Sequence, residues 1–463
     1  MSENKILQIL DSNLCVGCGT CTAMNPQGLR MTWDQYGFQI PQTTSGYAPK
    51  GEEKVCPFNI EPDQDVRTED EIANIFLSDA HNYDKKIGRY INTYVGFSKK
   101  YRMTSSSGGI ATYVSSQLIQ MGVVDAVAMV HESEDHLNRF EFKFVSNPED
   151  VTNGSKTKYY PVTYAEILQK IRVFPGKVAI SGVGCFIKSI RLLQYYDPIF
   201  RDKIKFTIGI ICGGIKSSFF SDYLAQKAGC KGDYKQPEFR VKNNNGNALD
   251  YSYSCIDTIT NEKHLLRMRS VGDMWGTGFF KANACDFCDD VTTELADISL
   301  GDAWLPEYQN DDRGQNVIVV RSEIAEQIIR TGLTSDELNV KELSLDRFLR
   351  SQRGSFNHRH KGLKFRINNA TRKGLSIPPK RHDNATINLL FKNVQRKRLQ
   401  TKSKSLSIWK ATRNADIFDR KSKKYLIALK ISTEMYHIDR LVPQLIRKGK
   451  TMISRFKKHT FHG

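Results

Sequence analysis

Short apolar stretches alternate with amphipathic stretches through the first half of the chain. Predominantly apolar runs of strand length occur at residues 90–97, 123–130, 177–181 and 206–212. Apolar residues at helical spacing follow three of these runs, over residues 110–119, 187–196 and 217–228. Short buried strands that alternate with amphipathic helices are typical of a parallel sheet with helical crossovers. The pattern therefore predicts an α/β fold with a mainly parallel sheet.

The glycines, serines and cysteines of this region gather directly after the expected strands. They form four short loops, at residues 105–109, 182–185, 212–214 and 301–304. Ligands of open α/β sheets bind beyond the carboxyl ends of the strands. We therefore expect the four loops to share one edge of the sheet and to form a cofactor crevice there.

The first of these loops, Ser105-Ser106-Ser107-Gly108-Gly109, opens the helix expected over residues 110–119. Hydroxyl groups, backbone N–H groups and the positive end of a helix can bind a phosphate, and glycine allows its close approach. The alternative is that a serine simply caps the helix. Because the run follows an apparent strand, the sequence favours the phosphate site.

Three cysteines near the start of the chain, Cys15, Cys18 and Cys21, are separated by two-residue gaps, and Cys56 stands downstream before Pro57. A four-iron cluster takes three thiolates from one tight loop and a fourth from elsewhere, often one followed by proline. Zinc sites usually pair two Cys-x2-Cys or Cys/His units. The spacing therefore favours a 4Fe–4S cluster over zinc.

A second pair with ligand spacing is Cys285-Asp286-Phe287-Cys288. Together with Cys185 and Cys212, on loops that follow expected strands, it offers four thiols for a second cluster. A lone Cys-x2-Cys is also consistent with half a zinc site or with a redox dithiol. The spacing by itself leaves these alternatives open.

The remaining cysteines and several histidines carry no such pattern. Cys230 and Cys255 have no partners at ligand spacing, and we expect them to be buried, inert thiols. His264, His358 and His360 are candidates for acid–base chemistry, but a surface histidine without function is the simpler interpretation of each. No catalytic residue is assigned.

The composition is that of a globular protein of several domains, since the 463 residues are 40% hydrophobic and 25% charged. No basic leader precedes an apolar stretch, and no apolar run reaches about eighteen residues, so we expect neither a signal peptide nor a spanning helix. Ten cysteines in such a chain indicate metal or redox ligands rather than disulfides. A cytoplasmic location follows from these expectations.

The net charge of +18 is concentrated in the tail, because residues 351–463 contain 29 Lys and Arg against 5 Asp and Glu. The tail therefore carries +24 and the rest of the chain −6. Apolar residues at helical spacing among these lysines predict basic, partly amphipathic helices. Such helices can bind the inner face of an anionic membrane, or they can be a solvated appendage. Specific nucleic-acid binding is disfavoured, because the tail has no recognised binding fold.

The motifs above occur in an order that resembles the coenzyme F420 hydrogenase/dehydrogenase beta-subunit family. The shared motifs are the first cysteine run with Cys56-Pro57 and residues 106–109, 182–185, 211–214, 285–288 and 297–304. The likeness extends over residues 10–365 and includes a closing stretch with Arg353, His358, Arg359 and Gly362. This chain has Gly184 and Gly213 where many members of the family have Pro and His.

The resemblance implies two domains, a ferredoxin-like 4Fe–4S module at residues 1–65 and an α/β domain with FAD and a second 4Fe–4S cluster at 66–365. The basic, mostly helical tail at 366–463, expected from its charge and periodicity, follows them as a third. The first cluster would be held by Cys15, Cys18, Cys21 and Cys56, and the second by Cys185, Cys212, Cys285 and Cys288. FAD would contact Ser106, Ser107, Gly108, Gly109, Gly301 and Asp302.

The implied activity is that of an iron–sulfur flavoprotein oxidoreductase. Electrons would pass between the clusters, FAD and a substrate or a partner such as ferredoxin or a hydrogenase or dehydrogenase subunit. Surface-polysaccharide metabolism is one setting in which members of the family occur. Two alternatives stay open, namely a non-catalytic electron-transfer subunit and a cluster-stabilised scaffold for a membrane-associated pathway.

Overall fold

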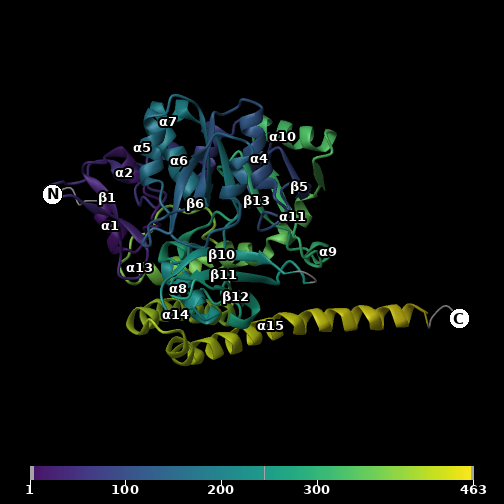
Figure 1. The fold of residues 1–463 in the computed structure, drawn as a ribbon. Helices are drawn as coiled ribbons and strands as arrows, with labels where there is room; N and C mark the ends of the chain where they lie inside the picture. Colours follow the sequence, from purple (N-terminus) through teal and green to yellow (C-terminus); the bar gives the residue numbers. More distant parts are fainter. Residues whose placement is uncertain (1–4, 244–245, 460–463) are drawn as a thin grey trace.

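A twisted eight-stranded sheet forms the centre of the molecule, in a computed structural model that describes residues 5–243 and 246–459 (Figure 1). The strand order is β15-β5-β14-β13-β9-β8-β6-β7. The bounds are β5 Asn92–Ser98, β6 Ala126–Glu132, β7 Phe140–Val145, β8 Val178–Val183, β9 Ile204–Ile210, β13 Ile298–Asp302, β14 Asn316–Val320 and β15 Leu338–Glu342.

Five of these eight strands run in one direction. β6, β8, β9 and β13 pair in parallel, and β5 has the same direction because it is antiparallel to β14, which is antiparallel to β13. β7, β14 and β15 run the other way. The expected parallel sheet is thus confirmed at its centre. Both flanks are antiparallel, because β7 pairs directly with β6 and β14 pairs directly with β13, the strand that precedes each in the chain.

Helices cover both faces of the sheet, as the alternation of buried side chains along each strand requires. In β8, Val178 and Ile180 pack with helices on one face, while Ala179 packs on the other. The first face carries α5 (Ala165–Val173), α6 (Gly184–Tyr196) and α7 (Pro198–Lys203), and the second carries α4 (Ile110–Gln120) and α10 (Glu323–Thr334).

A second, antiparallel sheet lies below the first in Figure 1 and was not anticipated from the sequence. It consists of β10 (Tyr234–Lys242), β11 (Tyr251–Asp257) and β12 (Lys263–Arg267). Its inner face and α8 (Ser218–Ala228) share an aromatic-rich core with the tail. The burial patterns of β10 and β11 do not alternate regularly, so these strands lack the period-2 signal of a half-buried strand.

The amino-terminal segment packs against α6 and shares its core. Its elements are α1 Lys5–Asp11, α2 Thr20–Met24, β1 Leu29–Trp33, β2 Gln39–Thr43, η1 Glu52–Val55, η2 Gln64–Val66, α3 Glu69–Phe76, β3 Asn82–Asp84 and β4 Gly88–Tyr90. Leu14 and Val16 belong to the same apolar cluster as Phe186 and Ile187. The segment is therefore joined to the main sheet by a common core.

Short connecting elements complete the body of the molecule. They are η3 Asp150–Gly154, η4 Met268–Val271, η5 Asn283–Phe287, α9 Pro306–Gln309, α11 Leu345–Ser351, α12 Arg353–Phe356, a π-helical turn at Asn357–Lys361 and α13 Leu363–Thr371.

Two long helices, α14 (Leu389–Thr412) and α15 (Ala415–His459), form the basic tail, and the later part of α15 projects beyond the body (Figure 1). The α14 side chain of Trp409 is fully buried against Tyr223, Phe280 and Phe418. The expected helices are confirmed, but α14 is part of a core rather than a solvated appendage. The side chains from residue 441 onward, including the apolar Leu441, Leu445 and Ile446, lie outside the described part of the chain.

No helix among residues 5–243 and 246–459 is long and apolar enough to cross a membrane.

Replacement of Trp409 by alanine is expected to reduce the free energy of unfolding by about 3–5 kcal/mol, because a large buried ring is lost and a cavity remains. Leu389→Ala is the matched control on the same helix, since Leu389 is 80% exposed, and we expect it to change stability by less than about 0.5 kcal/mol. Denaturant titration measures both. Equal effects would show that α14 does not contribute to the core.

Candidate functional site

A cavity of about 740 Å³ opens between the carboxyl edge of the large sheet and the small sheet. All four loops expected to share that edge contribute to it, including residues 105–107, 182–183, 212–214 and 301–302. Arg240, Tyr251 and Met268 line it from the small sheet and the turn that follows. The predicted crevice is therefore present, with a wall that the sequence did not reveal.

The residues expected to contact a flavin are mostly at this cavity. Ser106, Ser107, Gly109, Gly301 and Asp302 line it. Gly108 lies behind the cavity wall and packs closely against its neighbours. A Cβ atom at this position would lie 2.7 Å from the Gly96 oxygen and 2.8 Å from the Asn316 side chain.

The serines of this loop do not cap α4. The N-cap is Gly109, at φ 78°, and it makes no side-chain cap bond. Ser106 Oγ accepts a hydrogen bond from the Thr157 backbone N–H at 2.8 Å, and Ser107 Oγ donates to the Gln315 oxygen at 3.0 Å. The serine-cap alternative is therefore wrong, and the start of α4 faces the cavity through Ala111.

Several cationic side chains also surround the cavity, and the sequence analysis missed them. Lys156, Lys158 and Lys216 line it. Burial lowers the pKa of Lys158 to about 8 and that of Lys216 to about 7. Arg240 forms an ion pair with Asp302 at 2.6 Å, and this pair holds the loop after β13 in place. These cations would attract an anionic ligand.

The first four cysteines gather beside α2. Cys15 and Cys18 lie in the loop before this helix, Cys21 lies within it, and Cys56 follows η1. Burial raises the pKa of Cys21 well above its usual value, and the neighbouring Cys18, Cys15 and Cys56 thiols raise it further. Gly17, at φ 73°, donates its N–H to Cys15 Sγ at 3.4 Å. The four thiols are thus close enough to influence one another.

The second four cysteines gather around the end of β9. Burial raises the pKa of Cys185 well above its usual value, and Cys288, Cys285 and Cys212 raise it further. Cys212 also lines the cavity. The four thiols predicted to form the second quartet are therefore neighbours.

The two quartets adjoin each other. Cys18 acts on the pKa of Cys185, although the two belong to different quartets. Both thiols also raise the pKa of Tyr164, after burial as the main cause. The Tyr164 backbone N–H donates to the Cys18 oxygen at 2.8 Å, and its hydroxyl donates to the Ser181 oxygen at 2.8 Å. Tyr164 therefore lies between the quartets.

The spacing of the thiols differs from that of a single-ion site. Around tetrahedral zinc, with Zn–S bonds of about 2.3 Å, sulfurs are about 3.8 Å apart. Within the described residues, just one group brings three or more His, Cys or carboxylate ligand atoms within 4.8 Å of one another, and it contains none of the eight thiols. The quartets are wider than zinc requires.

Hydrogen bonds to sulfur come mainly from the loops around the second quartet. The N–H of Gly214 donates to Cys212 Sγ at 3.1 Å, and that of Ile215 donates to Cys285 Sγ at 3.2 Å. Arg359 is buried, and its guanidinium donates to Cys288 Sγ at 3.4 Å and to the Cys212 backbone oxygen. Arg359 thus brings a positive charge directly to this quartet.

The chain matches two family models that together span more than half of it. They describe the two parts of "Coenzyme F420 hydrogenase/dehydrogenase, beta subunit": residues 93–169 match the amino-terminal part and residues 176–346 match the carboxyl-terminal part. The chain belongs to this beta-subunit family. The matched residues contain the whole cavity edge and all four cysteines of the second quartet.

Two relatives of this chain have names that refer to coenzyme F420. The coenzyme F420-dependent sulfite reductase of Methanocaldococcus jannaschii is 25% identical over 75% of this chain and 52% of its own length, so the chain spans about half of that relative. The F subunit of the F(420)H(2) dehydrogenase from Methanosarcina mazei is 23% identical over 73% of this chain and 87% of its own length. A chain of the F420-reducing [NiFe] hydrogenase complex from Methanosarcina barkeri matches with a TM-score of 0.49 and 18% identity, over 65% of this chain and 99% of that chain.

Proposed function

We propose that this chain is an iron–sulfur flavoprotein that transfers electrons through two 4Fe–4S clusters to FAD in the cavity. The observation that carries the proposal is the continuity of the site. Tyr164 hydrogen-bonds both the Cys18 oxygen of the first quartet and the Ser181 oxygen at the end of β8, just before Cys185, and Cys212 of the second quartet reaches the cavity. An arrangement of this kind suits stepwise transfer of single electrons.

The thiol quartets fit iron–sulfur clusters by their chemistry. Four cysteine thiolates are the usual ligands of a 4Fe–4S cluster. Cys15, Cys18, Cys21 and Cys56 would hold the first cluster, and Cys185, Cys212, Cys285 and Cys288 the second. Backbone N–H groups and the Arg359 guanidinium would stabilise the more negative, reduced form of the second cluster, because hydrogen bonds to sulfur and positive charge raise its potential.

The cavity fits a flavin nucleotide by size and charge. Cofactor pockets of about 300–1,000 Å³ are typical. The start of α4, together with Lys156 and Lys158, would bind the pyrophosphate. When bound, a flavin exchanges two electrons with an organic substrate and one at a time with clusters. The Trp275 ring packs closely on Gly213, since a Cβ atom added to this glycine would lie 3.1 Å from the ring. This tryptophan would therefore shape the part of the cavity beside the second cluster.

The direct test is cofactor analysis of anaerobically purified protein. We expect about eight iron and eight sulfide per chain and about one FAD. Iron without flavin would support the scaffold alternative instead. Both cofactors without turnover in the isolated chain would support a non-catalytic electron-transfer subunit. Absence of both iron and sulfide would overturn the proposal.

The affinity for FAD is expected to fall as the pH rises through about 8. Below that pH the Lys158 ammonium is charged and attracts the pyrophosphate, and above it the charge is lost. A loss of about 1 kcal/mol corresponds to a roughly fivefold weaker Kd.

Fluorescence titration of the flavin-depleted protein between about pH 7.5 and pH 9.5 measures this effect. The Lys158→Met variant should bind more weakly and show a flat profile. Lys143→Met is the control, because Lys143 is exposed on β7 away from the cavity lining. A Lys158→Met variant with the wild-type pH profile would contradict the assignment.

A protein partner fits the family, since one relative is named as a subunit of F(420)H(2) dehydrogenase. We propose that ferredoxin or a hydrogenase or dehydrogenase subunit exchanges electrons with the first cluster. Surface-polysaccharide metabolism, which the resemblance implies, stays a prediction.

The tail supplies a surface for an anionic membrane. Four apolar side chains on α15, about half exposed or more, recur at helical spacing: Ile427, Ile431, Met435 and Ile438. Since residues 351–463 carry a net charge of +24, we propose that this face lies on an anionic bilayer.

Ile431→Asp/Met435→Asp is expected to weaken co-sedimentation with phosphatidylserine-containing vesicles at least about tenfold, because two apolar side chains no longer enter the bilayer. Leu137→Asp changes an even more exposed apolar side chain, on the connection between β6 and β7, and should bind normally. Unchanged binding of the α15 variant would remove the membrane surface from the proposal.

A further inference from the structure

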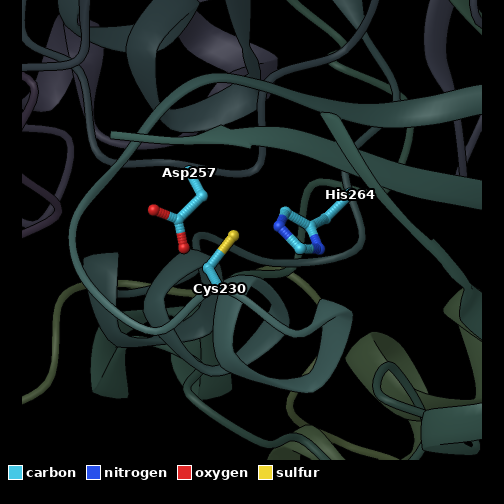
Figure 2. A group of neighbouring side chains, drawn as sticks. All are labelled: Cys230, Asp257 and His264. Carbon is cyan, nitrogen blue, oxygen red and sulfur yellow. The ribbon is translucent and has the colours of Figure 1, made fainter. Parts of the chain in front are cut away.

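A group of polar side chains outside the redox site meets where α8 ends and β11 and β12 pair. Cys230 follows α8, Cys255 and Asp257 lie on β11, and His264 lies on β12. Figure 2 shows the Cys230 sulfur between the Asp257 carboxylate and the His264 ring. We call these four residues the α8–β11 cluster.

The distances among three of these residues suit a single ion. One ligand atom each of Cys230, Asp257 and His264 lies within 4.8 Å of the others. Cys255 lies beside them, with its sulfur 3.1 Å from that of Cys230, and is opposite His264 in the strand register. Side chains from a helix end and two strands therefore converge on one point.

Burial and hydrogen bonding leave ligand atoms available there. Cys230, Cys255 and Asp257 are 6%, 0% and 1% exposed. His264 Nε2 is buried and has no hydrogen-bond partner among the described residues, although buried polar atoms are normally paired. A buried imidazole nitrogen without a hydrogen-bond partner, beside two thiols, is typical of a metal ligand whose remaining bond is made to the ion.

The Asp257 carboxylate is held firmly by the backbone around it. It accepts from the N–H groups of Lys231 at 2.8 Å, Ile259 at 2.7 Å and Thr260 at 3.3 Å. A carboxylate has about four lone-pair positions, so one remains for a ligand bond. Such outer hydrogen bonds are the usual means of orienting a metal ligand.

We propose that the α8–β11 cluster binds a zinc-class divalent ion. A thiol, an imidazole and a carboxylate are ligand types that tetrahedral Zn²⁺ accepts. Cys230, His264 and Asp257 would supply these three ligands, and a water molecule would complete the tetrahedron. Cys230, which looked inert in the sequence, is thus assigned a ligand role.

The ion would join α8 to the small sheet. That sheet supplies Arg240 and Tyr251 to the cavity wall, so the metal would fix one side of the cavity at a distance from it. The site is independent of the two quartets, which have their own cysteines.

The test is metal analysis of the full chain, purified anaerobically and supplied with Zn²⁺ alone. We expect about one zinc per chain in the wild type. Cys230→Ser and His264→Ala should each lose at least about 80% of that zinc and keep their iron and sulfide. His136→Ala is the matched control: His136 Nδ1 also faces a carboxylate, of Asp233 at 3.7 Å, but it is exposed and should keep the zinc.

Zinc-edge X-ray absorption of the wild type gives a readout that does not depend on variant folding. Mixed sulfur and nitrogen or oxygen ligands are expected. A shell of four sulfurs would place zinc in a quartet and overturn the proposal, as would wild-type protein that takes up no zinc. A disulfide between Cys230 and Cys255 in the anaerobic protein, detected by thiol labelling and mass spectrometry, would also overturn it.

Discussion

Cys212→Ser is expected to lower the iron content from about eight to about four atoms per chain and to slow electron flow into the cavity. Cys212 is the thiol of the second quartet that also lines the cavity, so its loss removes the cluster nearest to the flavin. We expect flavin reduction by dithionite-reduced ferredoxin to slow at least about 100-fold, because the remaining cluster must act over a longer distance. Iron analysis and stopped-flow absorbance measure the two effects.

Cys255→Ser is the matched control for this prediction. It is also a buried cysteine, but it lies in the α8–β11 cluster away from both quartets. Its iron content and its rate of flavin reduction should remain close to those of the wild type. A Cys212→Ser protein with a full complement of iron would contradict the proposed ligand set, and one with half the iron but normal flavin reduction would contradict the electron route.

Arg381→Gln is expected to destabilise the protein by about 3–5 kcal/mol, since breaking a buried ion pair leaves its partner charge unpaired. The guanidinium is 8% exposed and contacts Glu294 at 2.8 Å, Asp70 at 3.1 Å and Glu69 at 3.5 Å. Arg381 thereby connects α3, the loop after the second cysteine pair and the segment before α14. Denaturant titration under anaerobic conditions measures the loss.

Arg350→Gln is the control for the buried cation. Arg350 pairs with Asp346 across one helical turn, but both side chains are largely exposed. Surface pairs contribute about 0–1 kcal/mol, so this variant should be nearly as stable as the wild type. Equal stability of the Arg381 variant and this control would show that the buried network contributes no net stabilisation.

Local patterns sufficed for β5, β6, β8 and β9 of the central sheet and for the helices α4 and α6 that pack on it. Residues 206–212 were expected as a strand and form β9 at Ile204–Ile210, and residues 187–196 were expected as a helix and lie within α6. The spacing of apolar residues in these stretches indicates which side chains are buried, because side chains on one face recur at the period of the helix or strand. The glycines, serines and cysteines that follow the strands likewise predicted the edge of the sheet at which the cavity lies.

Contacts between distant segments were beyond such patterns. Arg381 meets Glu69 across more than three hundred residues, and Arg240 meets Asp302 across two sheets. Trp409 looked like part of a basic appendage, yet it is fully buried against Tyr223. None of these contacts can be predicted from the periodicity of the sequence, because each depends on how elements far apart in the chain pack together.

The cysteine spacings, the strand and helix periodicity and the family were determined by the sequence alone, since each is a property of neighbouring residues or of ordered motifs. Only the tertiary structure decided that Cys18 lies beside Cys185, that lysines surround the cavity and that Cys230 meets His264. The physical reason is that periodicity encodes which face of an element is buried, whereas the choice of partner depends on the summed packing of elements far apart in the chain.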